Sequence, residues 1–117
     1  MNPIFDRHGR VVAWLRDDRI HDLNGRHISF ISNGNFFGYN GAHIGQFSNG
    51  FFRDRRGYAL AFVNGATGGP VLPITSIPPI APIPAIAPIP PIPGIPPIPP
   101  IPSLSWSNTS LSQLLGA

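Results

Sequence analysis

Four segments with one shared pattern decide the fold of this 117-residue chain: IFDRHGRVVAWL (4–15), IHDLNGRHISFI (20–31), FFGYNGAHIGQF (36–47) and FRDRRGYALAFV (52–63). Each segment begins 16 residues after the one before it, without an insertion. Five aligned columns keep their residue class in all four copies, which chance explains poorly. The first 66 residues are therefore a fourfold internal repeat.

The columns are defined by their distance from a glycine that recurs in every copy, as Gly9, Gly25, Gly41 and Gly57. The other four columns stand five residues before the glycine (Ile4, Ile20, Phe36, Phe52), three after it (Val12, Ile28, Ile44, Leu60), four after it (Ala13, Ser29, Gly45, Ala61) and six after it (Leu15, Ile31, Phe47, Val63). We expect the large apolar columns to fill a common interior, and the small column to mark a crowded place.

Sixteen residues suit one β-hairpin with two strands and two short turns. The first turn is Asp-x-x-Gly, in which Asp bonds to backbone amides and Gly adopts a positive φ. The second is Asn-Gly at 33–34 and 49–50, a strong hairpin signal, with Asp17-Asp18 in the first copy. A lone hairpin cannot bury its apolar face, and ring closure removes exposed strand edges. The sequence predicts an all-β fold, a small pseudo-fourfold barrel of four 16-residue β-hairpin repeats.

The four segments resemble the fourfold β-flower domain, a shallow symmetric barrel of repeated hairpins, over about residues 3–66. The resemblance rests on the Asp-x-x-Gly turn and on the small residue before the second apolar pair. The third copy departs from it, with Gly38 in place of Asp and Gln46 where the other copies have an aromatic residue. Similar hairpins occur in YD-type repeat proteins, but the constant period favours the flower. The resemblance implies a distant relation to Tubby-like barrels, and with it an association with lipid or membrane; no activity is established for the family.

A second period begins after the repeat. Isoleucine recurs at every third position, as Ile74, Ile77, Ile80, Ile83, Ile86, Ile89, Ile92, Ile95, Ile98 and Ile101. Fourteen prolines between 73 and 102 favour a polyproline II helix, whose three residues per turn align all ten isoleucines on one edge. The same prolines argue against a transmembrane α-helix. Collagen is excluded because its third position must be Gly.

The isoleucine edge has two interpretations. The segment is either a stiff spacer or a packing surface, and a spacer needs no isoleucine register. Exposed isoleucine at this density would be sticky, which favours packing. Its partner would be the same edge in another subunit, the surface of the barrel, or a lipid, and we favour self-association into a homo-oligomer.

The last residues change character again. Leu111, Leu114 and Leu115 would share one face of a short helix, which about two turns cannot stabilise alone in water. We expect this helix either to dock on the protein as a plug or to act as a recognition motif, and we include its leucines in the self-association surface. The chain then divides into the repeat domain (1–66), a Gly-rich linker (67–72), the Ile-Pro segment (73–102) and a C-terminal segment (103–117).

Charge is confined to the repeat. Eight Arg and five Asp, with no Lys or Glu, give a net charge of +3, and all of them lie between Asp6 and Arg56. The absence of Cys excludes disulfides, thiolate metal sites and cysteine nucleophiles. No signal peptide or transmembrane helix is recognised, so a cytoplasmic location is the default expectation, with a peripheral membrane location as the alternative.

Three arginines around the last Asp-x-x-Gly turn are the candidate anion-binding group: Arg53, Arg55 and Arg56. Guanidinium groups suit phosphate, so the group could meet lipid headgroups, or it could be a solvated basic rim. Nucleic acid is not an expected partner, since no RNA- or DNA-reading motif is present. An aromatic column would either line the lipid site or fill the core and rim: Trp14, Phe30 and Phe62.

No catalytic residues, metal or cofactor are expected. His27 and His43 occupy equivalent positions, but two imidazoles are too few for a structural zinc site. Asp6, Asp22 and Asp54 share one turn position, where capping explains them better than acid–base catalysis. The expected function is a non-enzymatic structural or interaction module whose tail packs against itself in an oligomer or against the barrel. The alternative is a peripheral lipid-binding module with an apolar barrel mouth and an Arg rim.

Overall fold

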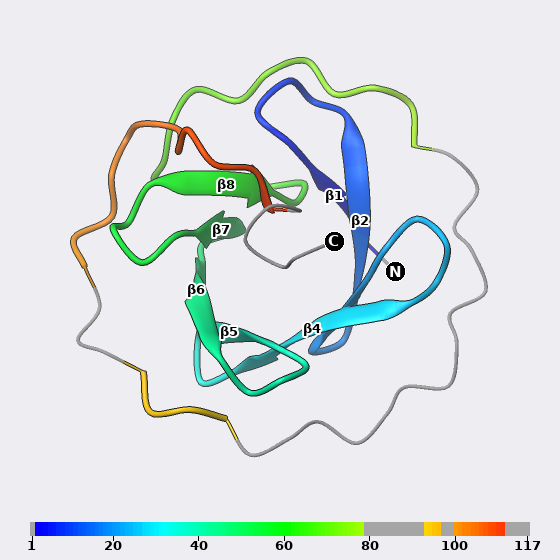
Figure 1. Ribbon diagram of the computed structural model, residues 1–117. Helices are drawn as coiled ribbons and strands as arrows, with labels where there is room; N and C mark the ends of the chain where they lie inside the picture. The colour runs from blue at the N-terminus through cyan, green and yellow to red at the C-terminus, as the bar shows by residue number, and fades with distance from the viewer. Residues whose placement is uncertain (1, 79–92, 97–99, 112–117) are drawn as a thin grey trace.

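The structure is a computed structural model that describes residues 2–78, 93–96 and 100–111. Its eight strands form a closed antiparallel barrel in which chain order is also spatial order (Figure 1). They are β1 (Asn2–Phe5), β2 (Val11–Arg16), β3 (Arg19–His21), β4 (His27–Ser32), β5 (Asn35–Gly38), β6 (His43–Ser48), β7 (Phe51–Arg53) and β8 (Ala59–Phe62). The ring closes where Phe5 of β1 pairs with Phe62 of β8. The predicted fourfold barrel of hairpins is confirmed.

Both kinds of predicted turn are present. In the Asp-x-x-Gly turns, one carboxylate oxygen accepts two backbone amides; Asp6 Oδ1 accepts those of His8 (2.8 Å) and Arg10 (3.0 Å). Asp22 and Asp54 form the same pair of bonds in their own turns, which confirms the capping role expected for these residues. In the third copy Asn40 supplies the side-chain oxygen instead, accepting the amide of Ala42.

The strand register shows why the apolar columns do not simply alternate. Ile4 pairs with Ala13 but Phe5 pairs with Val11, so Val12 is left without a partner in the ladder. A β-bulge of this kind inserts one residue and interrupts the two-residue alternation of a strand. The same shift recurs in all four repeats. It allows the columns three and four residues after the glycine both to pack on the interior cluster.

The interior is built from rings of equivalent residues. One ring is fully buried, with no exposed surface on any member: Ile4, Ile20, Phe36 and Phe52. The small column beside it is crowded, as predicted. At Gly45 a Cβ atom would overlap the carbonyl oxygen of Arg53 and lie 2.9 Å from the Phe36 ring, so only glycine fits there.

A second apolar cluster lies on the outer face of the barrel. Neighbouring residues of a strand point to opposite faces, so Phe5 and Phe51 point outward beside the inward Ile4 and Phe52. The Phe5 ring stacks on Phe62 with the centroids 5.4 Å apart. The Trp106 ring, from the C-terminal segment, covers them at 6.1 Å from Phe51 and 6.0 Å from Phe62.

The described parts of the tail lie around the outside of the barrel (Figure 1). Residues 70–78, 93–96 and 100–106 stand at different points of its periphery, and Trp106 forms a parallel bridge with Ala59 of β8. The chain then turns inward, because Leu111 is buried with Ile4 and Leu60 in the interior cluster. Beyond residue 111 the chain lies outside the described residues, and so do Leu114, Leu115 and most of the predicted helix.

Candidate functional site

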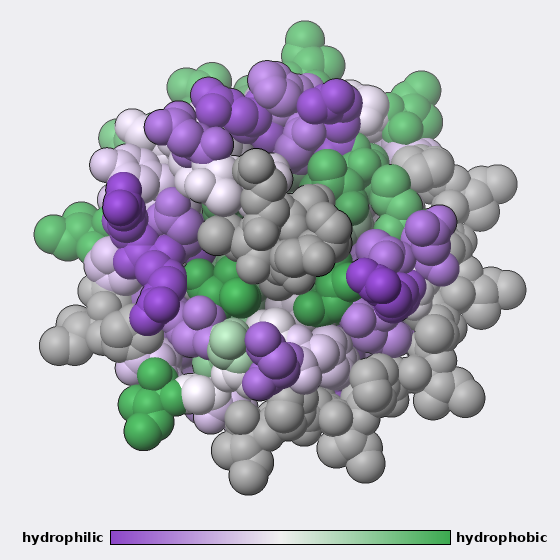
Figure 2. Space-filling model, in the orientation of Figure 1, coloured by the Kyte–Doolittle hydropathy of each residue, from purple (hydrophilic) through white to green (hydrophobic). Residues whose placement is uncertain are grey.

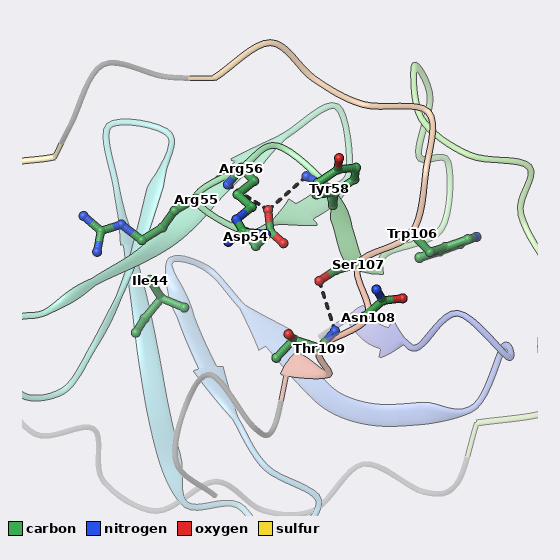
Figure 3. Close-up of a pocket in the computed structure, with 9 residues that line it drawn as sticks. All are labelled: Ile44, Asp54, Arg55, Arg56, Tyr58, Trp106, Ser107, Asn108 and Thr109. Carbon is green, nitrogen blue, oxygen red and sulfur yellow. Dashed lines mark hydrogen bonds between the residues drawn. The ribbon is translucent and has the colours of Figure 1, made fainter.

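A cavity of about 570 Å³ opens between the turn that joins β7 to β8 and the C-terminal segment. In Figure 3 the turn that carries Asp54 and Tyr58 lies on one side and the stretch from Ser107 to Thr109 on the other, while the Arg55 side chain extends away from that stretch. Its lining consists of Ile44, Asp54, Arg55, Arg56, Tyr58, Trp106, Ser107, Asn108 and Thr109. Polar and apolar atoms contribute about equally to the surface of the cavity, and Ile44 and the two aromatic rings belong to its apolar part.

The basic wall of the cavity is an Asp-x-x-Gly turn. Asp54 Oδ1 accepts the amides of Arg56 (2.9 Å) and Tyr58 (3.0 Å), which fixes the backbone of the turn (Figure 3). Gly57 takes a φ of 90°, which side chains other than hydrogen rarely allow. The carboxylate is occupied by backbone amides, so the exposed Arg55 and Arg56 side chains remain available to a ligand.

The opposite wall is a short polar stretch of the C-terminal segment. Ser107 Oγ accepts the amide of Thr109 at 3.1 Å, and the Ser107 carbonyl accepts Arg7 Nη1 at 3.4 Å. A second cavity, of about 220 Å³, lies against the same stretch and is lined in part by Arg7 and Arg10. Residues 107–111 are thus flanked by two cavities, each with two arginines in its lining.

Arg53 does not belong to this basic wall, and its expected place at an exposed rim is wrong. Only 2% of its surface is exposed. Its guanidinium donates to the carbonyls of Gly57 (2.6 Å), Ser103 (2.7 Å) and Gly68 (3.1 Å), and it lies 5.3 Å from the centre of the Phe51 ring. Burial lowers the pKa of this guanidinium, and the nearby Asp54 carboxylate opposes that shift. Arg53 is a clasp between the barrel, the linker and the tail.

The predicted aromatic column is also absent from the cavity. Trp14, Phe30 and Phe62 are all buried. Phe62 belongs to the outer cluster under Trp106, and Phe30 stacks on Phe37 at 5.3 Å. The burial of all three rings agrees with the core-filling alternative. Of the six residues predicted for a lipid site, the cavity brings together Arg55 and Arg56.

The isoleucines that the structure describes point away from the barrel. The exposed fraction is 96% for Ile74, 95% for Ile77, 96% for Ile95 and 89% for Ile101. In Figure 2, apolar side chains project around the perimeter, beyond the polar residues of the face shown. These four side chains therefore do not pack against the barrel. The remaining isoleucines, Ile80, Ile83, Ile86, Ile89, Ile92 and Ile98, lie outside the described residues.

The two equivalent histidines have separate surroundings. His27 lies against the rings of His21 (5.8 Å) and Tyr39 (6.4 Å), whereas His43 Nε2 is 3.0 Å from Asn35 Oδ1. Burial, and then the charge of Arg55, lowers the pKa of His43 below its usual 6.5. Within the described ranges, no group of three or more His, Cys, Asp or Glu side chains is placed to hold a metal ion.

The cavity can bind an anion or a hydrogen-bonding ligand. Two exposed guanidinium groups supply charge, while Tyr58, Asn108 and Thr109 supply hydroxyl and amide groups. The clustering of the arginines is visible in the sequence, but no pattern in it points to Asn108 and Thr109. Their approach depends on the docking of a segment some 50 residues further along the chain. In the part of the chain that is described, no helix has the length and apolar character to cross a bilayer.

A protein-family model described as "4-fold beta flower protein" matches residues 2–115. The match extends over the tail as well as the repeat domain. Neither the curated proteins nor the solved structures include a match to this chain.

Proposed function

The chain belongs to the 4-fold beta flower family, and from that premise we propose that it is a non-catalytic interaction module that binds further copies of itself through the isoleucine edge of its tail. The observation that carries the proposal is the near-complete exposure of Ile74, Ile77, Ile95 and Ile101. Large apolar side chains that stay exposed to water at this density favour burial against another molecule. Burial against another molecule would stabilise the complex by roughly 1.5–3 kcal/mol for each such side chain.

The way in which the tail is attached to the barrel supports self-association. In the parts of the tail that the structure describes, backbone hydrogen bonds rather than isoleucine side chains join it to the barrel. The Ser76 and Ser103 amides donate to the Gly9 and Gly57 carbonyls at 2.9 and 3.0 Å. An edge held in this way loses little conformational freedom on binding, which lowers the entropic cost of association. Two such edges are chemically identical, so a second copy is a self-complementary partner.

The test is the solution mass of the full chain by light scattering over a range of concentrations. We expect the wild type to exceed the 12.6 kDa of one chain, and a variant with Ile74, Ile77, Ile95 and Ile101 all replaced by Thr to return to that mass. The matched control is Leu23→Thr with Leu72→Thr, which removes exposed apolar side chains that lie outside the three-residue isoleucine period. A wild type that stays monomeric, or a control that dissociates equally, would overturn self-association through this edge.

A second candidate function, binding to an anionic membrane surface, is favoured by one juxtaposition. The exposed Arg55 and Arg56 share their turn with Gly57, at which a Cβ atom would lie 2.5 Å from the backbone carbonyl oxygen of the exposed Ile101. Basic and apolar side chains therefore occur together at one place. Basic and apolar side chains in one place suit a peripheral membrane protein. Each basic residue near an anionic membrane surface contributes about 1 kcal/mol to the free energy of binding.

Vesicle flotation tests the second function. We expect the full chain to float with phosphatidylserine-containing vesicles at low salt, and the Arg55→Gln, Arg56→Gln double variant to bind roughly 30-fold more weakly. An Arg16→Gln, Arg26→Gln variant has the same net charge and changes exposed arginines that do not line the cavity. Equal losses in both variants would show general charge attraction, and no flotation of the wild type would end this alternative.

A further inference from the structure

Tail amides bind the repeat glycines in the order of the repeats. The amides of Ser76, Gly94 and Ser103 donate to the carbonyls of Gly9 (2.9 Å), Gly41 (2.9 Å) and Gly57 (3.0 Å), respectively. These acceptors occupy one column of the 16-residue repeat, and they therefore stand at equivalent places around the barrel. The column presents a track of carbonyl groups on which an extended chain can bind.

The spacing of the donors is regular. From Gly41 to Gly57 is one repeat, and the donors Gly94 and Ser103 are nine residues apart. From Gly9 to Gly41 is two repeats, and their donors are 18 residues apart. Nine tail residues therefore correspond to each repeat. By this rule the carbonyl of the second glycine, Gly25, corresponds to residue 85.

The sequence carries the same nine-residue period. Within each Ile-x-x triplet the third position is proline at 79, 82, 88, 91, 97 and 100. The exceptions are small residues that keep an N–H group: Ser76, Ala85, Gly94 and Ser103. Because proline has no N–H, the chain can donate from this edge only at every third triplet. Three of these four residues are the donors that the structure describes, which points to the fourth as a donor too.

The dimensions agree with this register. Nine residues of polyproline II span about 28 Å, so four such steps span about 110 Å. The Cα atoms extend over 36 and 35 Å in the two longer directions. A circle of this diameter has a circumference of about 110 Å, which equals the length of four nine-residue steps. A nine-residue step therefore fits one quarter of the circumference.

We propose that the barrel is a fourfold binding site for a polyproline II strand that offers one N–H group in every nine residues, and that the chain's own tail is its ligand. Ala85 lies outside the described residues, and the nine-residue period of the sequence predicts its amide as the donor to the Gly25 carbonyl. The track positions require glycine for two reasons. The tail backbone approaches these residues closely, and their φ angles are positive. A Cβ atom on Gly9 would overlap the Ile74 carbonyl oxygen, and one on Gly57 would lie 2.5 Å from that of Ile101.

The register also accounts for the direction of the isoleucines. A polyproline II helix has three edges, and the edge formed by the third positions of the triplets is turned to the barrel at each donor. The isoleucine edge is then turned away from it, as the exposure of Ile74 and Ile101 shows. The assignment does not depend on self-association or lipid binding, because it concerns only contacts within one chain.

Amide hydrogen exchange of the full-length, isotope-labelled protein tests the assignment. We expect the Ala85 amide to be protected at least about tenfold more than the Ala81 and Ala87 amides, each relative to its unstructured rate. A scalar coupling across the hydrogen bond, from the Ala85 nitrogen to the Gly25 carbonyl carbon, would identify the acceptor. Ser76, Gly94 and Ser103 are the internal references. Protected references with an Ala85 amide no more protected than Ala81 or Ala87 would overturn the nine-residue rule at Gly25, and unprotected references would overturn the track itself.

Two proline substitutions provide an independent readout. Ala85→Pro removes the proposed donor, whereas Ala87→Pro makes the same chemical change two residues along, at a second position of a triplet. Proline at a compatible extended position stabilises by restricting the unfolded chain. We therefore expect Ala87→Pro to keep or raise the melting temperature and Ala85→Pro to lower it by a few degrees. Equal shifts in the two variants would contradict a specific role for Ala85.

Discussion

Replacing Arg53 by methionine should lower the free energy of unfolding by about 3–5 kcal/mol, because buried backbone carbonyls lose a charged hydrogen-bond donor. Arg53 is 2% exposed, and its guanidinium donates to three backbone carbonyls, from the β7–β8 turn, the linker and the tail. Methionine fills a similar volume but donates no hydrogen bond. The Ser103 and Gly68 carbonyls then lose this donor, and each buried carbonyl without a partner costs about 1–3 kcal/mol.

Thermal unfolding and amide exchange together check this result. We expect the melting temperature to fall by roughly 10–20 °C for a chain of this length. The amides of Ser103 and Ser105 should lose protection first, because the clasp acts on that part of the tail. Arg55→Met is the matched control; that side chain is exposed, so its replacement should change stability by no more than about 0.5 kcal/mol. Equal stability of the Arg53 and Arg55 variants would mean that the clasp contributes nothing to the fold.

The burial of Arg53 was predictable from one comparison within the sequence and not from another. Grouped with its neighbours Arg55 and Arg56, it suggests an exposed basic rim. Compared by repeat column, it occupies the place of Phe5, His21 and Phe37, four residues before each glycine. Those three residues are buried, and so is Arg53. The column was the better guide, because equivalent positions of a symmetric barrel share one environment, whereas neighbours along a strand point to opposite faces.

The barrel was predictable because its information is local and repeated. Asp-x-x-Gly and Asn-Gly turns define each hairpin, and Asp17, Asn33 and Asn49 adopt the positive φ values of 52°, 52° and 51° that such turns require. The four bulges leave no comparable mark, since a bulge depends on how two strands pair. The apolar columns nevertheless identified the interior residues, because the same positions are apolar in every repeat and pack on the interior cluster.

The tail was predictable in its periodicity but not in its direction. A three-residue period places the isoleucines on one edge, whichever way that edge faces. Its orientation depends on hydrogen bonds between residues far apart in the chain, such as Gly94 with Gly41. The cavity has the same origin, because Asn108 and Thr109 line it together with Arg55 through the packing of the C-terminal segment, with Trp106 on the outer cluster. Long-range contacts of this kind have no signature in a single sequence.

Replacing Phe52 by alanine should also cost about 3–5 kcal/mol, through the loss of a buried ring and the cavity left behind. Phe52 has no exposed surface and belongs to the interior ring with Ile4, Ile20 and Phe36. Its centroid lies 5.4 Å from that of Phe36, in a nearly perpendicular arrangement, and 4.5 Å from that of Phe47. Closed barrels collapse poorly around a deletion, because every strand is held by two neighbours. Urea unfolding monitored by circular dichroism would measure the loss.

The pseudo-symmetry of the ring supplies the matched variant. Two of its four members are isoleucine, so the backbone at this column accepts that side chain. Phe52→Ile should therefore cost far less than Phe52→Ala, about 1–1.5 kcal/mol, because most of the volume is kept and no new backbone geometry is required. If the two substitutions proved equally costly, the four positions would not be equivalent in packing. The repeat would then describe the backbone of the barrel but not the filling of its interior.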